Sequence, residues 1–125
     1  MEKRRVAIQV AIDTIEEAEA LRIASMIGDA CRGGVLPPDS VIIEAGTPLI
    51  KSRGIGVLSK LKVAAPEVPL LADMKTADVG RLEASLAYAH GADYTTVLAA
   101  APLSTLRSAL EAALEAGKGL AVDLL

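Results

Sequence analysis

The sequence is poor in aromatic residues. Its 125 residues include no Phe or Trp and only two Tyr, although 52% of them are hydrophobic. The core must therefore be built from Ala, Leu, Val and Ile, a composition more typical of helices alternating with parallel strands than of a β-sandwich. Aromatic platforms on which single-stranded nucleic acids could stack are also missing. We therefore expect an α/β fold and no nucleic-acid partner.

Cysteines, basic clusters and long apolar runs are equally scarce. The single cysteine, Cys31, excludes an intramolecular disulfide and a cysteine-ligated metal cluster, and we interpret it as an ordinary thiol of a cytoplasmic protein. A formal net charge of −3 without a basic cluster argues further against nucleic acid. No apolar run reaches the ~18 residues that a membrane span requires, so we expect no membrane partner.

Apolar segments alternate with segments of helical periodicity. We expect five parallel strands joined by four helices, beginning and ending with a strand. The expected strands lie in residues 6–13, 41–44, 70–78, 94–99 and 119–125. The second helix should follow a turn at residues 46–48, and Ser104 should cap the fourth helix. We expect these residues of the last two helices to face the core: Leu82, Leu86 and Ala89, then Leu106, Leu110, Ala113 and Leu114.

This alternation fits either an open doubly wound sheet or part of a (β/α)8 TIM barrel. Charged residues at the ends of four of the five expected strands favour the barrel, because barrel enzymes draw catalytic groups from several strand ends. They are Asp13, Glu44, Asp73 with Lys75, and Asp123. The first strand is also not followed by the glycines of a dinucleotide- or phosphate-binding loop.

The length of the chain fits only part of such a barrel. A whole barrel takes ~250 residues, so we expect residues 1–125 to form a single partial domain, about the first half of a barrel. The apolar segment 122–125 would form a free parallel edge that invites pairing with another chain. A homodimer or a complementing half-barrel could cover that edge.

The charged end of segment 70–78 is the strongest single indication of a functional site. Along a strand, residues two apart share a face, so Asp73 and Lys75 should point the same way as Leu71. Burying these charges in a barrel mouth costs desolvation energy, which a substrate or a metal ion could offset. An ordinary ion pair at a strand end, with Asp78 capping the next helix, would explain the same pattern.

Three stretches resemble the 3-hexulose-6-phosphate synthase family of the orotidine 5′-phosphate decarboxylase suprafamily. They are residues 9–13 (QVAID), 43–51 (IEAGTPLIK) and 72–78 (ADMKTAD). The Asp-x-Lys-x-x-Asp motif of the third stretch marks the suprafamily, and the second stretch favours the synthase branch. The likeness covers the first five strands of a family barrel that has eight.

This resemblance implies a Mg²⁺-dependent aldol reaction through an enediolate intermediate. Formaldehyde would condense with the sugar phosphate ribulose 5-phosphate to give hexulose 6-phosphate, or the reverse reaction would occur. By the family pattern, Glu44 and Asp73 would hold the magnesium ion, and Lys75 would neutralise the charge that develops on the enediolate.

The resemblance also assigns three further aspartates. Asp78 matches a catalytic residue that reaches into the site of a second subunit in relatives, which implies a homodimer. Asp13 and Asp123 match substrate-positioning acids.

Relatives bind the substrate phosphate with loops after strands seven and eight, which these 125 residues do not include, so catalysis by this chain alone remains open. Two alternatives also remain, a non-catalytic half-barrel assembly module and a relative of 3-keto-L-gulonate 6-phosphate decarboxylase.

Overall fold

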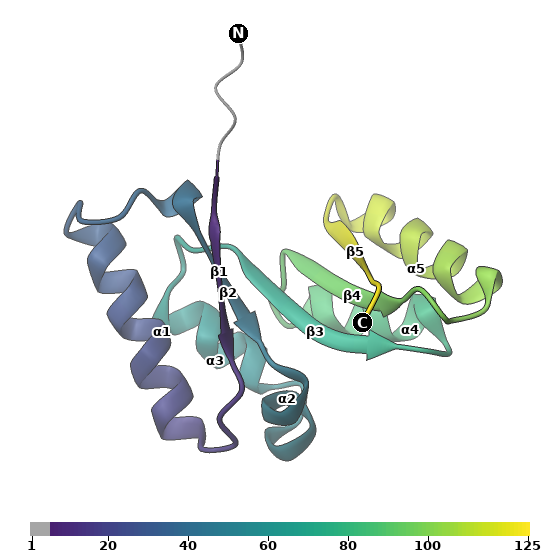
Figure 1. Cartoon of the computed structure of the whole chain (residues 1–125), viewed down its shortest axis with the longest axis horizontal. Coiled ribbons are helices and arrows are strands. Elements are labelled where there is room, and N and C mark those ends of the chain that lie inside the picture. Colours follow the sequence, from purple (N-terminus) through teal and green to yellow (C-terminus); the bar gives the residue numbers. More distant parts are fainter. Residues whose placement is uncertain (1–5) are drawn as a thin grey trace, which may run out of the picture.

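A computed structural model describes residues 6–125, over which helices alternate with five strands (Figure 1). The elements are β1 (Ile8–Ile12), α1 (Glu17–Arg32), the 3₁₀ helix η1 (Pro38–Ser40), β2 (Val41–Ala45), α2 (Thr47–Arg53), α3 (Val57–Ala64), β3 (Leu70–Thr76), α4 (Gly80–Ala89), β4 (Tyr94–Leu98), α5 (Leu103–Ala116) and β5 (Gly119–Asp123). The expected α/β alternation is thus confirmed. None of the helices in this range combines the length and the apolar character needed to cross a bilayer.

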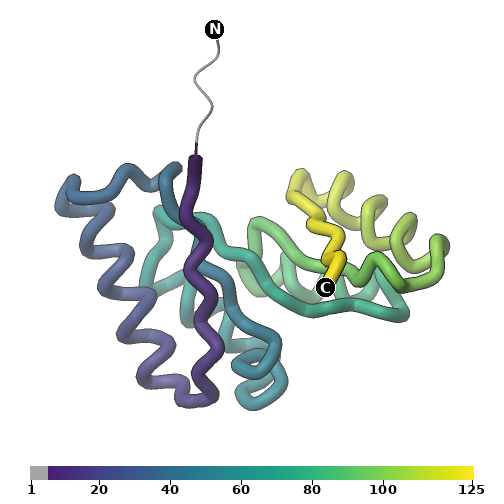
Figure 2. Tube along the Cα trace, in the orientation of Figure 1, coloured from purple at the N-terminus to yellow at the C-terminus, as the bar shows by residue number. Residues whose placement is uncertain are grey.

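The five strands form one parallel sheet in the order β1-β2-β3-β4-β5. In a doubly wound fold the strand order reverses at a switch point, whereas in a barrel each strand lies beside its neighbour in sequence. The observed order is that of a barrel. Figure 2 follows the chain from β1 through β3, which links a group of helices formed by α1–α3 to a second group formed by α4 and α5.

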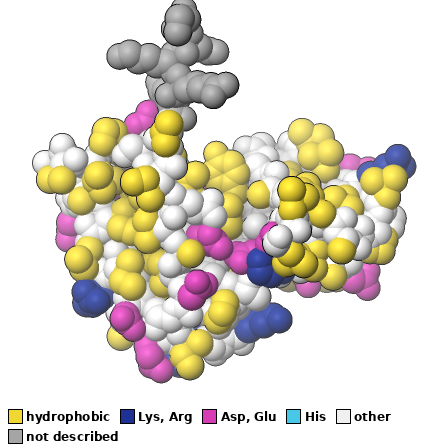
Figure 3. All heavy atoms as spheres, viewed as in Figure 1, with side chains coloured by type: hydrophobic (Ala, Val, Ile, Leu, Met, Phe, Trp, Pro, Cys, Tyr) yellow, Lys and Arg dark blue, Asp and Glu magenta, His cyan; other side chains and the backbone are white. Residues whose placement is uncertain are grey.

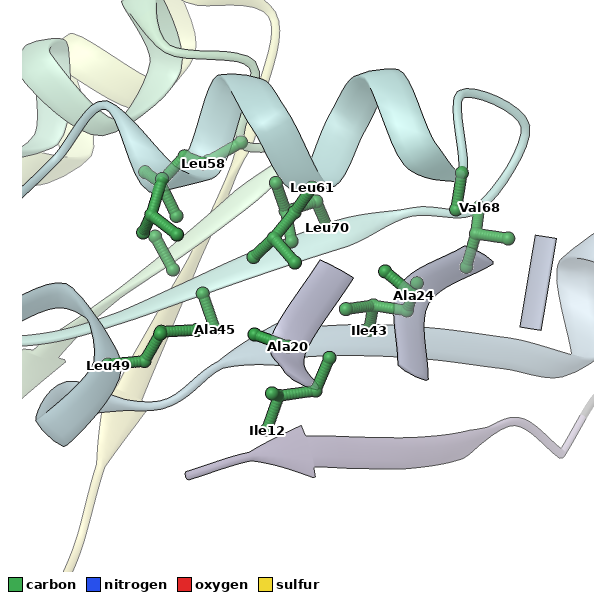
Figure 4. Close-up of a cluster of buried hydrophobic side chains, with 14 of the residues drawn as sticks. Ile12, Ala20, Ala24, Ile43, Ala45, Leu49, Leu58, Leu61, Val68 and Leu70 are labelled. Atoms are coloured by element: carbon green, nitrogen blue, oxygen red, sulfur yellow. The ribbon is translucent and has the colours of Figure 1, made fainter. Parts of the chain in front are cut away.

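The sheet is covered on one side by two apolar clusters. The larger one joins α1, α2 and α3 to β1–β3, and Figure 4 shows residues such as Leu58 and Leu61 of α3 above Ile43 and Leu70 of the strands. The smaller cluster lies between α4, α5 and β5, and its members are Ala84, Tyr88, Ala109, Ala112 and Ala113, with Leu120 packed against them. Because these helix residues are mostly alanines, α4 and α5 can pack closely.

The expected second helix is in fact two helices, so the described residues form five α-helices and not four. The turn expected at residues 46–48 contains the start of α2, with Pro48 in its first turn, where a proline is tolerated. The chain then breaks at Gly54, whose φ of +78° suits glycine, before α3 begins at Val57. Helical periodicity alone could not reveal this break.

The core-facing residues expected in the last two helices are partly wrong. All three residues expected in α4 are exposed, Leu82 at 59%, Leu86 at 40% and also Ala89. Leu110 and Leu114 of α5 are exposed as well, whereas Leu106 is half-buried and Ala113 is buried as expected. Each helix carries a second stripe of smaller residues, and that stripe packs against the sheet and the other helix. Ser104 does not cap α5, because Pro102 occupies the cap position. Four of the strands end slightly earlier than expected, for example β1 at Ile12 and β5 at Asp123, whereas β2 ends one residue later, at Ala45.

Candidate active site

The strand register brings charged side chains from four strands to one edge of the sheet. Glu44 of β2 is paired with Leu71, two residues before Asp73 on β3, and Asp123 ends β5 opposite Leu98 of β4. Asp13 follows directly after β1. Carboxyl ends of parallel strands meet at one edge, so these side chains share the mouth of the barrel-like sheet. Figure 3 shows a band of acidic side chains with basic ones beside it, between the two groups of helices.

Lys75 joins two of these acids. Its ammonium group donates a hydrogen bond to Oδ2 of Asp123, and its Nζ lies 3.2 Å from Oδ2 of Asp73. The hydrogen bond to Asp123 raises the pKa of Lys75, against the effect of burial, and the neighbouring Asp73 adds to the rise. In turn, Lys75 lowers the pKa of Asp123. The structure thus brings together three of the residues that the sequence singled out, across 48 positions of the chain.

Asp73 is buried and held by two threonines that the sequence analysis did not identify as site residues. The Thr47 hydroxyl, at the start of α2, lies 2.7 Å from the backbone oxygen of Asp73 and 3.0 Å from its Oδ2. The Thr96 hydroxyl of β4 donates to Oδ1 of Asp73 at 2.8 Å. Thr96 could have been found from the strand register, because it lies two residues after Tyr94, which pairs with the site-facing Leu71.

Glu44 lies beside Asp73 without a cation partner among the described residues. Burial raises the pKa of Glu44, and the negative charges of Asp73 and Asp13 raise it further, whereas a hydrogen bond from the Gln9 side chain opposes the rise. Gln9 points into the site from β1, because its place two residues before Ala11 puts it on the face that carries Glu44. Gln9 is thus a further residue of the site, which the sequence had indicated only as the first residue of the stretch 9–13.

Asp13 and Asp78 lie at the margins of this group. Asp13 is exposed, and its Oδ1 lies only 2.1 Å from an ideal Cβ at residue 46; the backbone oxygen of Ile12, 2.8 Å from the same position, makes glycine the favoured residue there. Asp78 is exposed in the loop between β3 and α4, and its Oδ1 accepts a hydrogen bond from the amide of Val79 at 2.7 Å. Over residues 6–125, no hydrogen bond or ion pair joins Asp78 to Lys75 or Asp73.

The carboxylates of Glu44 and Asp73 are the candidate metal ligands of this site. No cluster of three or more His, Cys, Asp or Glu residues able to hold a metal occurs within residues 6–125. Glu44 and Asp73 are nevertheless adjacent: burial is the main cause of the raised pKa of Glu44, and the neighbouring charge of Asp73 raises that pKa further. Two carboxylates completed by water and substrate oxygens are a common way of binding Mg²⁺. The donor set therefore fits magnesium.

Comparison with known proteins places these residues in a family. The chain is 42% identical over 118 residues to the 3-hexulose-6-phosphate synthase of Mycobacterium gastri, covering 94% of this chain and 53% of that protein. A crystal structure of a 3-hexulose-6-phosphate synthase superposes with a TM-score of 0.85, covers 95% of this chain and 53% of its own, and is 42% identical. The 3-keto-L-gulonate-6-phosphate decarboxylase of Vibrio cholerae superposes with a TM-score of 0.83 at 30% identity, covering 94% of this chain and 51% of its own.

These neighbours are TIM-barrel enzymes, which confirms the expected barrel-type fold, and the chain spans about half the length of the relatives it matches. The profile of the orotidine 5′-phosphate decarboxylase / HUMPS family matches residues 7–125. The family resemblance inferred from residues 9–13, 43–51 and 72–78 is therefore confirmed. The chain belongs to the orotidine 5′-phosphate decarboxylase / HUMPS family.

Proposed function

We propose that this chain carries the metal-binding and enediolate-stabilising part of a 3-hexulose-6-phosphate synthase. The reaction would be the aldol condensation of formaldehyde with ribulose 5-phosphate, or its reverse. The observation that carries the proposal is the position of Lys75 between Asp73 and Asp123, with Glu44 on the other strand beside Asp73, in a chain 42% identical to a protein of that name.

Glu44 and Asp73 would hold a magnesium ion in this proposal. When bound, Mg²⁺ would bind the substrate oxygens and withdraw charge from them. Thr47 and Thr96 hydrogen-bond to the oxygens of Asp73, and Gln9 to Glu44, so the two carboxylates are oriented before any ligand arrives.

Lys75 would act as an electrostatic stabiliser in this reaction. Two carboxylates beside the ammonium group favour its charged form, so Lys75 is suited to face a developing enediolate and not to remove a proton. Asp123 holds the ammonium group in place, and Asp13 lies at the edge where a sugar phosphate would enter.

The position of Asp78 supports a homodimer. Among the described residues its carboxylate makes no bond to the Lys75 site, and exposed apolar side chains follow it, Val79 at the cap of α4 and Leu82 and Leu86 on one face of that helix. A second copy packed on this face would cover the apolar stripe and receive Asp78 in its own site.

The test is the formaldehyde-dependent consumption of ribulose 5-phosphate in the presence of Mg²⁺. We expect turnover by the wild-type chain and a loss of at least about 100-fold in Lys75→Ala, the scale at which preorganised charge stabilisation contributes. Lys60→Ala is the matched control, because Lys60 pairs with Glu17 on the outer helical surface. Absence of turnover in the wild type would refute catalysis by this chain. Release of CO₂ from 3-keto-L-gulonate 6-phosphate would instead support the decarboxylase alternative.

A further inference from the structure

Strand β3 departs from regular pairing exactly where the site residues lie. Its register with β4 runs from Ala72 opposite Thr95 directly to Thr76 opposite Val97. Residues 73–75 of β3 therefore stand opposite the single residue Thr96 of β4. Such a bulge bends the strand and re-aims its side chains, and bulges are over-represented next to active sites.

The bulge places Lys75 in an unfavourable backbone conformation. Its φ is +46°, in the left-handed region that residues other than glycine rarely adopt. A conformation of this kind persists only where the surrounding structure holds it in place. The contacts of the Lys75 backbone therefore decide where its ammonium group lies.

Thr96 supplies that contact. Its side-chain oxygen accepts a hydrogen bond from the backbone amide of Lys75 at 2.9 Å and donates one to Oδ1 of Asp73 at 2.8 Å. Thr96 is buried, 7% exposed, so neither hydrogen bond faces competition from bulk water. One hydroxyl group thus uses its donor and its acceptor on the two charged residues of the bulge. The Thr47 hydroxyl, by contrast, hydrogen-bonds within the described residues only to Asp73.

We infer that Thr96 is a positioning residue that fixes Asp73 and Lys75 relative to each other. It does so by bonding to both residues within the bulge, to the backbone amide of Lys75 and to the carboxylate of Asp73. Its effect on catalysis rests on the proposed function, whereas its effect on the Lys75 backbone does not. Without the hydroxyl, the Lys75 amide and one Asp73 oxygen lose a partner, and the strained backbone at Lys75 is free to relax.

The test compares Thr96→Val with Thr95→Val, which is a matched control. Thr95 is the adjacent residue on β4, is 1% exposed, and donates its hydroxyl proton to the backbone oxygen of Ala72 at 3.1 Å. Both variants replace a buried threonine by a residue of similar shape and remove hydroxyl hydrogen bonding. Only Thr96→Val removes contacts to Asp73 and Lys75. Thr96→Ser restores the hydroxyl group.

Two readouts separate positioning from a merely structural role. Amide hydrogen exchange, followed by NMR without substrate, should be about fivefold or more faster at Lys75 in Thr96→Val, as expected for the loss of one ordinary hydrogen bond. In the ribulose 5-phosphate assay, kcat should fall about 10- to 100-fold with a smaller change in KM, the usual cost of removing a group that orients a metal ligand. Thr95→Val should match the wild type in both readouts, and Thr96→Ser should recover most of each.

Equal effects of Thr96→Val and Thr95→Val on Lys75 exchange and on kcat would overturn the inference, because Thr96 would then be only a buried polar residue. If the wild-type chain shows no turnover, the proposed function fails, and the exchange measurement alone decides the role of Thr96. Unchanged exchange at Lys75 in Thr96→Val would then refute it.

Discussion

Asp93 holds the opposite end of the sheet together from its position just before β4. Its Oδ2 accepts hydrogen bonds from Nζ of Lys62 at 2.7 Å and from the amide of Leu70 at 3.0 Å, while Oδ1 accepts one from Nζ of Lys118 at 2.8 Å. One carboxylate thereby joins α3 to the starts of β3 and β5. The end of a barrel away from the strand carboxyl ends generally serves stability, and this cluster has that character.

We predict that Asp93 makes folding sensitive to acid. Burial on its own would raise the pKa of Asp93, but hydrogen bonds from Lys118, Lys62 and the Leu70 amide outweigh it and lower the pKa to about 2, from 3.8. A carboxylate whose pKa is lower in the folded state stabilises that state above the unfolded pKa, and the stabilisation is lost as pH falls from about 4 towards 2. The stabilisation amounts to about 2 kcal/mol.

Urea unfolding of the wild type and of Asp93→Asn between pH 7 and pH 2 checks this expectation. The variant should be less stable than the wild type at pH 7, and the difference should shrink towards pH 2, because other carboxylates titrate alike in both proteins. A difference that stays constant with pH would show that Asp93 acts through packing and not through its charge.

At the scale of the elements, α4 and α5 depend on a close approach at Gly80. A Cβ atom at this residue would lie 2.2 Å from the backbone oxygen of Thr105, which a rotamer change cannot relieve. We predict that Gly80→Ala lowers the free energy of unfolding by about 1–3 kcal/mol through overpacking. Gly56→Ala is the control: Gly56 has φ −60° and open space around its Cβ position, so this variant should be neutral or stabilise by up to about 1 kcal/mol. Thermal unfolding of both variants distinguishes them, and equal melting temperatures would contradict the predicted clash.

The elements also show which features a sequence can reveal. Apolar runs located all five strands, and because parallel strand ends meet, they also predicted that Asp73, Lys75 and Asp123 would come together. The bulge in β3 was not predictable, since nothing in the residue type of Lys75 favours a positive φ. Roles for Thr47 and Thr96 were missed because a threonine in an apolar strand or at a helix start also reads as an ordinary structural residue.

The prediction of which faces of α4 and α5 are buried was partly wrong for a different reason. α4 and α5 are apolar on more than one stripe, so periodicity offered two candidate faces, and the stripe that carries most of the leucines was chosen. The observed cluster is formed mainly by alanines, with Tyr88, because two helices and a sheet converge there. Four of the five leucines that were assigned to the core, all except Leu106, are instead exposed at the surface, and this difference matters for the whole molecule.

For the molecule as a whole, the exposed apolar stripe of α4 is the surface on which the proposed homodimer should form. Leu82 and Leu86 are 59% and 40% exposed and lie on one face of α4, and Val79, the cap residue between Asp78 and the helix, is 54% exposed. We predict that the wild-type chain is a dimer by light scattering and that the double variant Leu82→Glu/Leu86→Glu is a monomer, because four like charges would meet in an apolar interface. Turnover by this double variant should also fall, because Asp78 of a monomer would no longer reach the site of a second copy. Met26→Glu, which places a single glutamate on an exposed position of α1 in the other group of helices, should remain dimeric and active. A wild-type monomer with full activity would refute the role of Asp78 in a neighbouring site, whereas a dimer that survives the double variant would place the interface elsewhere.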